Sequence, residues 1–165
     1  MGNRSSSSVE VTTPGERDVV VKRWFDAPVA LVWQCYTEPT LVRRWLLGPP
    51  GWSLTVCEID LRVGGAFRYR WQNDTDGGAF GIGGIFRQVD PERLIRHSEQ
   101  PEDAPEMPES LCKIEFIPHG GRTELIMTMT YGDGDLRNQV LATGMADGMG
   151  MSFDLLDAIL QEQRR

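Results

Sequence analysis

Alternating apolar and polar residues predict that most of the chain forms β-strands. The segment RDVVVKRWF, from residue 17, alternates in this way, and six further stretches of strand character follow between Trp52 and Tyr131. These stretches are SLTVCEIDLRV, GAFRYRWQN, AFGIGGIFRQV, LIRHSE, LCKIEFI and TELIMTMTY. Turn sequences rich in glycine, proline and aspartate separate them, so the pattern predicts about seven strands.

Helical spacing of apolar residues occurs in two places. After the first strand, DAPVALVWQCYTEPTLVRRWLL predicts two short helices, with Pro28 suited to the first turn and Pro39 at the start of the second. Near the C-terminal end, TGMADGMGMSFDLLDAIL gathers its apolar residues on one arc at about 100° per residue. We therefore expect one long helix that includes residues 143–151. Consecutive strands with helices at both ends predict an α+β fold whose long helix covers the concave face of the sheet.

Small residues lie at the centre of the apolar arc of this long helix. Gly148 and Ser152 fall in the middle, with Met145 and Met149 beside them. Two interpretations are open. The helix approaches the sheet closely and a bulky sheet residue fills the space, or these residues form the ceiling of a cavity lined by adaptable methionines. Gly150 falls on the solvent side and has no packing role in either interpretation.

Charge and size limit the classes of partner. The chain has 165 residues, of which 17 are basic and 24 acidic, so its formal charge of -7 disfavours nucleic acids and anionic membrane surfaces as partners. The hydrophobic content of 40% is enough for one core. We expect a single domain over residues 17–165, preceded by a disordered, serine-rich polar leader over residues 1–16.

Cysteine usage and hydropathy favour a soluble cytoplasmic protein. Cys35, Cys57 and Cys112 are far apart and form no CxxC pair, which is typical of reduced core thiols. No apolar run approaches the roughly 20 residues that a membrane span requires. The opening MGNRSS fits the N-myristoylation pattern at Gly2, but so short a pattern also occurs in ordinary polar leaders.

Five stretches in succession resemble one protein family: FDAPVALVWQCYTEPTLVRRWLLGPPGW, DLRVGGAFRYR, GIFRQVDPERLI, TELIMTMTY and GMADGMGMSFDLLDAIL. They are similar to bacterial homologues of the activator of the ninety-kilodalton heat-shock ATPase, the AHSA1-like family. This family belongs to the SRPBCC superfamily of START-like, pathogenesis-related and polyketide-cyclase-like proteins. The resemblance covers about residues 17–163. It implies a helix-grip fold, in which a curved antiparallel sheet holds the C-terminal helix with a cavity between them.

The chain departs from the family pattern at two places. Met149 stands where the family commonly has a tryptophan, and Leu46 and Leu47 stand where it often has another. Both replace a rigid aromatic surface with a flexible aliphatic one. These departures suggest a wider or more pliable cavity, or compensating repacking.

Ten residues are candidates for ligand contact in such a cavity: Trp45, Trp52, Tyr69, Trp71, Met127, Met129, Met145, Gly148, Met149 and Ser152. Strand alternation places Phe67 on the same face as Tyr69 and Trp71, and places Met127 with Met129. The sequence does not decide whether each set faces the helix or solvent.

Catalytic and metal-binding motifs are absent from the sequence. We find no GxSxG, no HExxH and no phosphate loop, and we expect no cofactor, no metal and no catalytic residue. His97 and His119 are expected to have structural or solvent-facing roles. Arg68 and Arg70 are expected to belong to a charged ladder on the solvated side of the sheet. If one of them pointed inward instead, it would anchor a carboxylate ligand.

These observations favour a non-catalytic protein that binds a small apolar or aromatic molecule. Two alternatives stay open. The family name suggests a co-chaperone that contacts a heat-shock ATPase in a stress response, and superfamily relatives suggest a cyclase or hydrolase of polyketide-like substrates. A homodimer formed through an exposed strand edge or through the helix also stays open.

Overall fold

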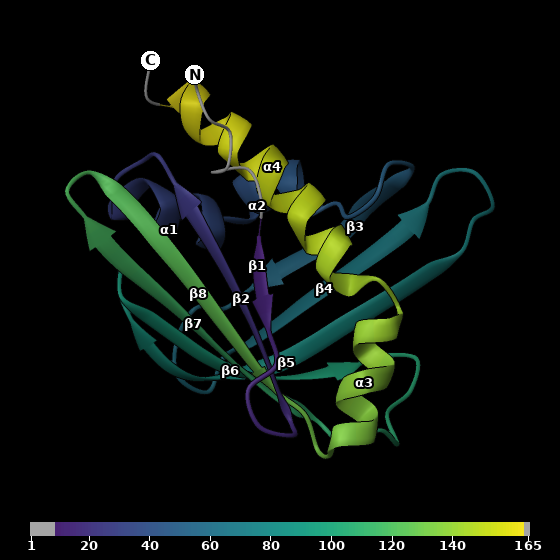
Figure 1. Ribbon diagram of the computed structural model, residues 1–165. Helices are drawn as coiled ribbons and strands as arrows, with labels where there is room; N and C mark the ends of the chain where they lie inside the picture. Colours follow the sequence, from purple (N-terminus) through teal and green to yellow (C-terminus); the bar gives the residue numbers. More distant parts are fainter. Residues whose placement is uncertain (1–8, 164–165) are drawn as a thin grey trace.

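The computed structural model describes residues 9–163 and contains one curved antiparallel sheet with four helices (Figure 1). The strands are β1 (Glu10–Thr12), β2 (Asp18–Phe25), β3 (Trp52–Ile59), β4 (Ala66–Asn73), β5 (Ala79–Asp90), β6 (Leu94–Pro101), β7 (Ser110–His119) and β8 (Arg122–Thr130). The helices are α1 (Val29–Thr37), α2 (Pro39–Trp45), α3 (Gly134–Ala142) and α4 (Met145–Gln163). The strand order in the sheet is β1-β2-β8-β7-β6-β5-β4-β3. β2 and β3 therefore lie near opposite edges of the sheet, and α1 and α2 connect them along the chain.

The predicted α+β helix-grip architecture is confirmed, but the strand count differs by one. The described part of the chain has eight strands, because Glu10–Thr12 form β1 within the segment that we expected to be a disordered leader. All three residues are exposed, and β1 pairs with β2 in the register Val11↔Val21. Hydrogen bonding to a strand edge, rather than burial of its own side chains, therefore holds this segment. Gly2 lies outside the described residues.

The C-terminal helix is interrupted where we expected it to be continuous. α3 ends at Ala142 and α4 begins at Met145, with Gly144 between them at φ +83°. The N–H of Gly144 donates to Leu141 O at 3.2 Å, which closes the last turn of α3. A left-handed residue after a helix is usually glycine, because glycine has no Cβ to clash there. Residues 145–151 are helical as predicted, whereas α3 was not predicted.

The concave face of the sheet packs against α4, which crosses it diagonally (Figure 1). Buried residues of β2 alternate with outward ones, and this alternation turns Arg23 toward the helix. Its side chain is 0% exposed, and Nη1 lies 3.0 Å from Asp154 Oδ1 of α4. This ion pair joins the second strand of the sheet to the middle of the helix.

The helices α1 and α2 cover one end of the concave face. Trp33 and Tyr36 of α1 contact the ring of Phe116 on β7, with centroids 5.1 and 5.6 Å apart. Trp45 of α2 stacks on Phe153 of α4, with centroids 6.0 Å apart. The core therefore lies between the sheet and three helices.

Cys35, Cys57 and Cys112 are free and buried.

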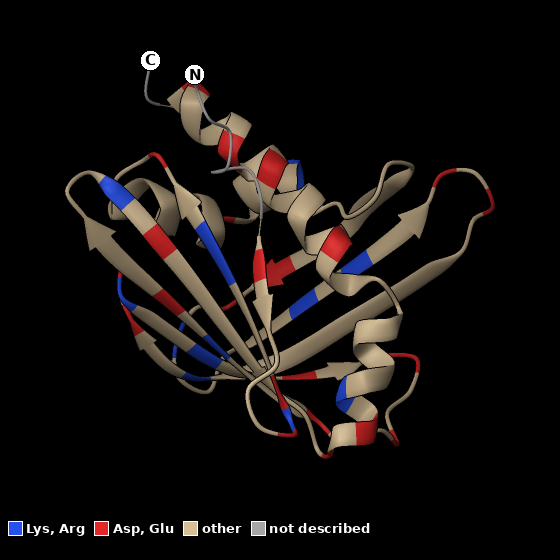
Figure 2. Cartoon of the chain, in the orientation of Figure 1, with Lys and Arg blue, Asp and Glu red and all other residues tan. Residues whose placement is uncertain are grey.

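Charged residues recur along the strands of the sheet (Figure 2), and those of β4 lie on its outer face. Arg68 and Arg70 point outward as predicted, but their ion-pair partner is Glu102, which follows β6; Arg70 Nη1 lies 3.2 Å from Glu102 Oε1. The alternative in which either arginine anchors a ligand inside the sheet is wrong. Within residues 9–163, no helix has the length and hydropathy needed to cross a membrane.

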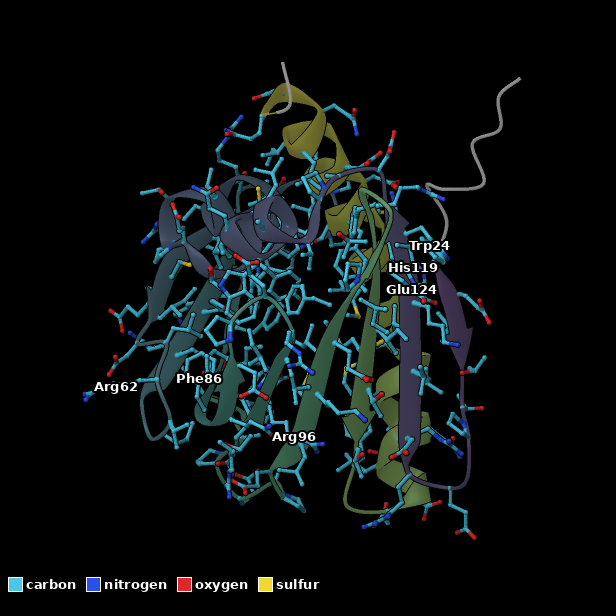
Figure 3. The ribbon with its side chains drawn as sticks, turned by 90° about the vertical axis from the view of Figure 1, so that its left-hand side faces the viewer. Trp24, Arg62, Phe86, Arg96, His119 and Glu124 are labelled. Carbon is cyan, nitrogen blue, oxygen red and sulfur yellow. The ribbon has the colours of Figure 1, made fainter. Side chains whose placement is uncertain are left out.

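His119 lies on this outer side, as expected of a solvent-facing histidine. Its ring packs on Trp24 with centroids 4.7 Å apart, and its Nε2 lies 3.2 Å from Glu124 Oε1 (Figure 3). Arg122 covers the same indole at 4.9 Å. The cluster joins the β7–β8 hairpin to β2.

Candidate ligand-binding cavity

A cavity of about 630 Å³ lies between the concave face of the sheet, the C-terminal end of α2 and the first half of α4. All ten residues that the sequence singled out contribute to its wall. Whether these residues contact a ligand stays a prediction.

One face of α4 forms the ceiling of the cavity. Met145, Gly148, Met149 and Ser152 all line it, at the spacing of one helical face. A Cβ built on Gly148 would meet only Pro49 Cδ, at 3.7 Å. The space beside Gly148 is therefore not filled by a bulky sheet residue, and of the two interpretations of this glycine the cavity ceiling is the one observed.

We expected Gly150 to face open solvent, but the structure places another residue beside it. A Cβ at this position would meet Val9 Cγ2 at 3.7 Å, an ordinary van der Waals contact. The residue just before β1 therefore lies against the outer side of α4. The sequence pattern missed this contact because it assigned Val9 to a disordered leader.

Hydrogen bonds fix the turn after α2 against the helix and the sheet. The N–H of Gly48 donates to Ser152 Oγ at 2.9 Å, and Trp71 Nε1 donates to Leu46 O at 2.8 Å. Ser152 thus contributes a structural hydrogen bond in addition to its place in the ceiling. Leu46 and Leu47 also line the cavity.

Aromatic rings form the wall and the rim. Phe80 stacks on Trp71 with centroids 4.9 Å apart and meets Trp52 edge-on at 5.4 Å. Phe80 is 46% exposed, and Pro49 and Gly144 also line the cavity while exposed to solvent. The mouth therefore opens between the turn after α2, the β4–β5 hairpin and the α3–α4 junction.

The inner wall comes from the inward faces of β4 and β8. Phe67, Tyr69 and Trp71 of β4 face the cavity together, as do Met127 and Met129 of β8. This settles the strand phase that the sequence left open. Trp45 closes the inner end beside α1, with its Nε1 donating to Cys35 O at 2.9 Å.

Glu99 is the acidic side chain that sequence reasoning missed. It lies on β6 in the wall of the cavity, and burial among protein atoms raises the pKa of its carboxyl to about 7. Its surface is partly accessible because it borders the cavity. Among residues 9–163, the hydrogen bonds and ion pairs include none to this carboxyl; only the backbone carbonyl of Glu99 accepts a side-chain hydrogen bond, from Ser110 Oγ at 3.3 Å.

Protonated groups surround this carboxyl. Burial raises the pKa of Tyr69, of Tyr131 and of the Cys112 thiol, and the nearby Glu99 raises each of them further. The three groups therefore stay neutral across the physiological range. They supply weak hydrogen-bonding capacity and no positive charge.

His97 lies two residues before Glu99 and also lines the cavity, so the expectation of a solvent-facing or purely structural site is incomplete. Its ring packs between Phe67 and Phe86 with centroids 4.6 and 6.1 Å apart. Its Nδ1 lies 2.9 Å from Ser98 O, which fixes the proton on Nδ1 because a carbonyl only accepts. Burial lowers the pKa of His97, so the ring is neutral at pH 7.

Few charged residues line the cavity. Glu99 is the only carboxylate among the described lining residues, and none of them is lysine or arginine. Across residues 9–163, no group of three histidine, cysteine, aspartate or glutamate side chains is placed to hold a metal ion. The arrangement can enclose an apolar molecule and offer it one acidic group.

Comparison of the sequence with protein families identifies the family of the chain. The chain matches, over residues 26–161, the sequence profile described as Activator of Hsp90 ATPase homolog 1-like protein. No match is found among curated proteins.

Solved structures share the fold over nearly the whole chain. A protein from Rhodobacter sphaeroides is 27% identical with a TM-score of 0.85, covering 94% of this chain and 99% of its own. A protein from Nitrosomonas europaea is 28% identical with a TM-score of 0.80, covering 92% of this chain and 99% of its own. An AHSA1-like protein from Aeromonas hydrophila, at 20% identity and a TM-score of 0.68, covers 87% of this chain and 94% of its own; it shows the fold alone.

Proposed function

Because the chain belongs to the family of Activator of Hsp90 ATPase homolog 1-like proteins, we propose that it binds a small, largely apolar or aromatic molecule in the cavity between the sheet and α4. The observation that carries the proposal is the cavity itself. Its volume of about 630 Å³ lies inside the range of about 300–1,000 Å³ typical of small-molecule sites. Its wall is mainly aromatic and aliphatic, and it has a mouth to solvent.

The wall combines fixed and adaptable surfaces. The indoles of Trp45 and Trp71 are held by hydrogen bonds to backbone carbonyls, so their rings are positioned before a ligand arrives. Met127, Met145 and Met149 are unbranched and polarizable, and they adjust to the shape of an apolar guest. A fixed aromatic end and a flexible ceiling suit a ligand that contains a ring.

The direct test is native mass spectrometry after incubation with a mixed library of lipids and aromatic compounds. Retention of one ligand per chain by the wild type, and its loss from Gly148→Leu, supports the proposal. Gly150→Leu is the matched control, because it adds the same side chain to the outer side of the same helix. An interior that retains nothing from the library would contradict binding.

A second candidate is catalysis on a molecule held in the cavity, as in polyketide cyclases or hydrolases. One observation favours it: Glu99 supplies the acid or base that the sequence motifs did not reveal, with a pKa of about 7 that suits proton transfer at neutral pH. The same experiment separates the two functions. A binding protein returns each ligand with unchanged mass, whereas an enzyme returns a product.

A co-chaperone role would follow the family description instead. Its test is capture of the heat-shock ATPase from the same cell and a change in that ATPase's rate. We also propose a cytoplasmic location, which the three free, buried cysteines support because free thiols persist in reducing compartments.

A further inference from the structure

We propose that Glu99 is the recognition group of the cavity, and that the ligand is a lipophilic amine: an apolar or aromatic molecule that carries a protonated nitrogen. This inference rests on the proposed binding function and specifies the class of ligand. It assigns the polar end of the ligand to one residue.

The position of Glu99 follows from the alternation of β6. Ile95, His97 and Glu99 all line the cavity, while Arg96 between them is exposed on the other face. Glu99 is partly buried in the wall of the cavity, and among the hydrogen bonds and ion pairs within residues 9–163 its carboxyl has no protein partner. The carboxyl oxygens are therefore open to a polar group on a molecule bound in the cavity, and no protein group has to be displaced first.

The surroundings of Glu99 select a cation rather than an anion. No lysine or arginine occurs among the described residues of the wall, and the buried ring of His97 is neutral. A fatty acid or other carboxylate would therefore meet a like charge with no compensating cation. A protonated nitrogen gains a charge-assisted hydrogen bond from Glu99.

Aromatic faces add to this preference. Tyr36, Tyr69 and Tyr131 line the cavity; burial is the main cause that raises the pKa of each, and the charge of Glu99 adds to the rise. A cation beside the faces of such rings is stabilised by their quadrupoles, and more so where water is excluded. The formal charge of -7 also attracts cations toward the protein.

The pH dependence follows from the groups around the carboxyl. The titratable groups that surround it are Tyr36 from α1, Tyr69 from β4, Cys112 from β7, Tyr131 after β8 and His97 from its own strand. Burial raises the pKa of the tyrosines and the thiol and lowers that of the histidine, so all stay neutral above pH 7. Glu99 alone changes charge near pH 7, and amine binding should strengthen as it ionises.

Three naphthalene probes of nearly equal size test the inference: 1-naphthylmethylamine, 1-naphthalenemethanol and 1-naphthoic acid. Calorimetric titration of the full chain at about pH 8 should give an affinity for the amine about tenfold higher than for the alcohol, with the acid weakest. In Glu99→Gln the amine and alcohol affinities should converge, while alcohol binding is retained. Glu106→Gln, which removes the same charge from an exposed loop, should keep the wild-type ratio.

The outcomes separate this inference from the proposed function. If the alcohol binds but the amine has no advantage, or if Glu99→Gln keeps that advantage, the cavity binds ligands and the assignment of Glu99 is wrong. If none of the three probes binds to the folded wild type, both proposals fail. At about pH 5.5 the amine's advantage should shrink as Glu99 becomes protonated, and an unchanged ratio would contradict the assignment.

Discussion

The backbone N–H of Gly48 donates a hydrogen bond of 2.9 Å to Ser152 Oγ, joining two residues that are 104 positions apart in the chain. The bond ties the turn after α2 to the middle of α4. Both residues line the cavity, so this contact holds the ceiling against one side of the mouth.

Ser152→Ala should destabilise the protein by about 1 to 2 kcal/mol. The alanine leaves the partly buried N–H of Gly48 without its acceptor, and an unsatisfied buried donor costs more than a typical hydrogen bond contributes. Chemical denaturation measures the difference in the free energy of unfolding. Ser53→Ala, which removes an exposed hydroxyl bonded to Asp74, serves as the control and should change stability by less than about 0.5 kcal/mol.

Gly148 should tolerate a methyl group and gain stability from it. The only heavy atom near its Cβ position is Pro49 Cδ at 3.7 Å, and alanine is favoured over glycine inside a helix by about 1 kcal/mol. Thermal unfolding of Gly148→Ala should therefore show a higher Tm than the wild type. A marked loss of stability would mean that the helix packs closely on the sheet at this point and that the ceiling has no space beneath it.

Glu99→Gln should become more stable relative to the wild type as the pH rises. Burial raises the pKa of Glu99 from its ordinary value of 4.5 to about 7. Between these two values the folded protein holds a proton that the unfolded chain has released, so the wild type loses stability as pH increases. The advantage of Glu99→Gln should grow across this window to at most about 3 kcal/mol.

The wild type must be compared with Glu99→Gln because His97 changes stability with pH in the direction opposite to Glu99. Burial lowers its pKa, so below about pH 6.5 the unfolded chain binds a proton that the folded protein does not, and stability falls on acidification. This contribution is present in both proteins and cancels in the difference. A difference between wild type and Glu99→Gln that stays constant from pH 4.5 to 7.5 would place Glu99 in contact with bulk water.

Arg70 and Trp71 are neighbours on β4 with opposite orientations. Arg70 pairs with Glu102 outside the sheet, whereas Trp71 lines the cavity. Arg70→Ala should leave probe affinity unchanged and cost about 1 kcal/mol of stability or less, because the ion pair is only partly buried and lies on the outer face of the sheet, away from the cavity. Trp71→Phe should weaken binding, because it removes part of the wall and the hydrogen bond to Leu46 O. Equal effects of the two substitutions on binding would contradict the strand phase.

The residues on the inward face of α4 could be predicted from the sequence because helical periodicity is local. Met145, Gly148, Met149 and Ser152 follow one arc whatever the helix packs against. The break at Gly144 was missed because the apolar arc continues through it, and only the backbone conformation distinguishes a junction from a helical turn. Similarly, β1 depends on pairing with β2, and nothing in its own exposed residues indicates that partner.

Glu99 was missed for a different reason. Alternation along β6 places Glu99 on the same face as Ile95, which is buried. This alternation is the sequence signal that could have indicated an inward-facing Glu99. A charged residue is seldom buried without a partner, so a glutamate at the end of a strand gives no reason to expect a cavity-facing carboxyl. The sequence of a strand does not show whether its inward face borders a cavity, where a carboxyl is tolerated, or a filled core.

The central claim is that the space under α4 is a binding cavity. The most direct measurement is a fluorescence titration of wild type, Gly148→Leu and Gly150→Leu with the neutral probe N-phenyl-1-naphthylamine. We predict saturable binding of one probe per chain to the wild type and to Gly150→Leu, and an affinity at least about tenfold lower for folded Gly148→Leu, because its leucine side chain enters the cavity. Absence of saturable binding to the wild type, or equal affinity in all three proteins, would contradict the claim.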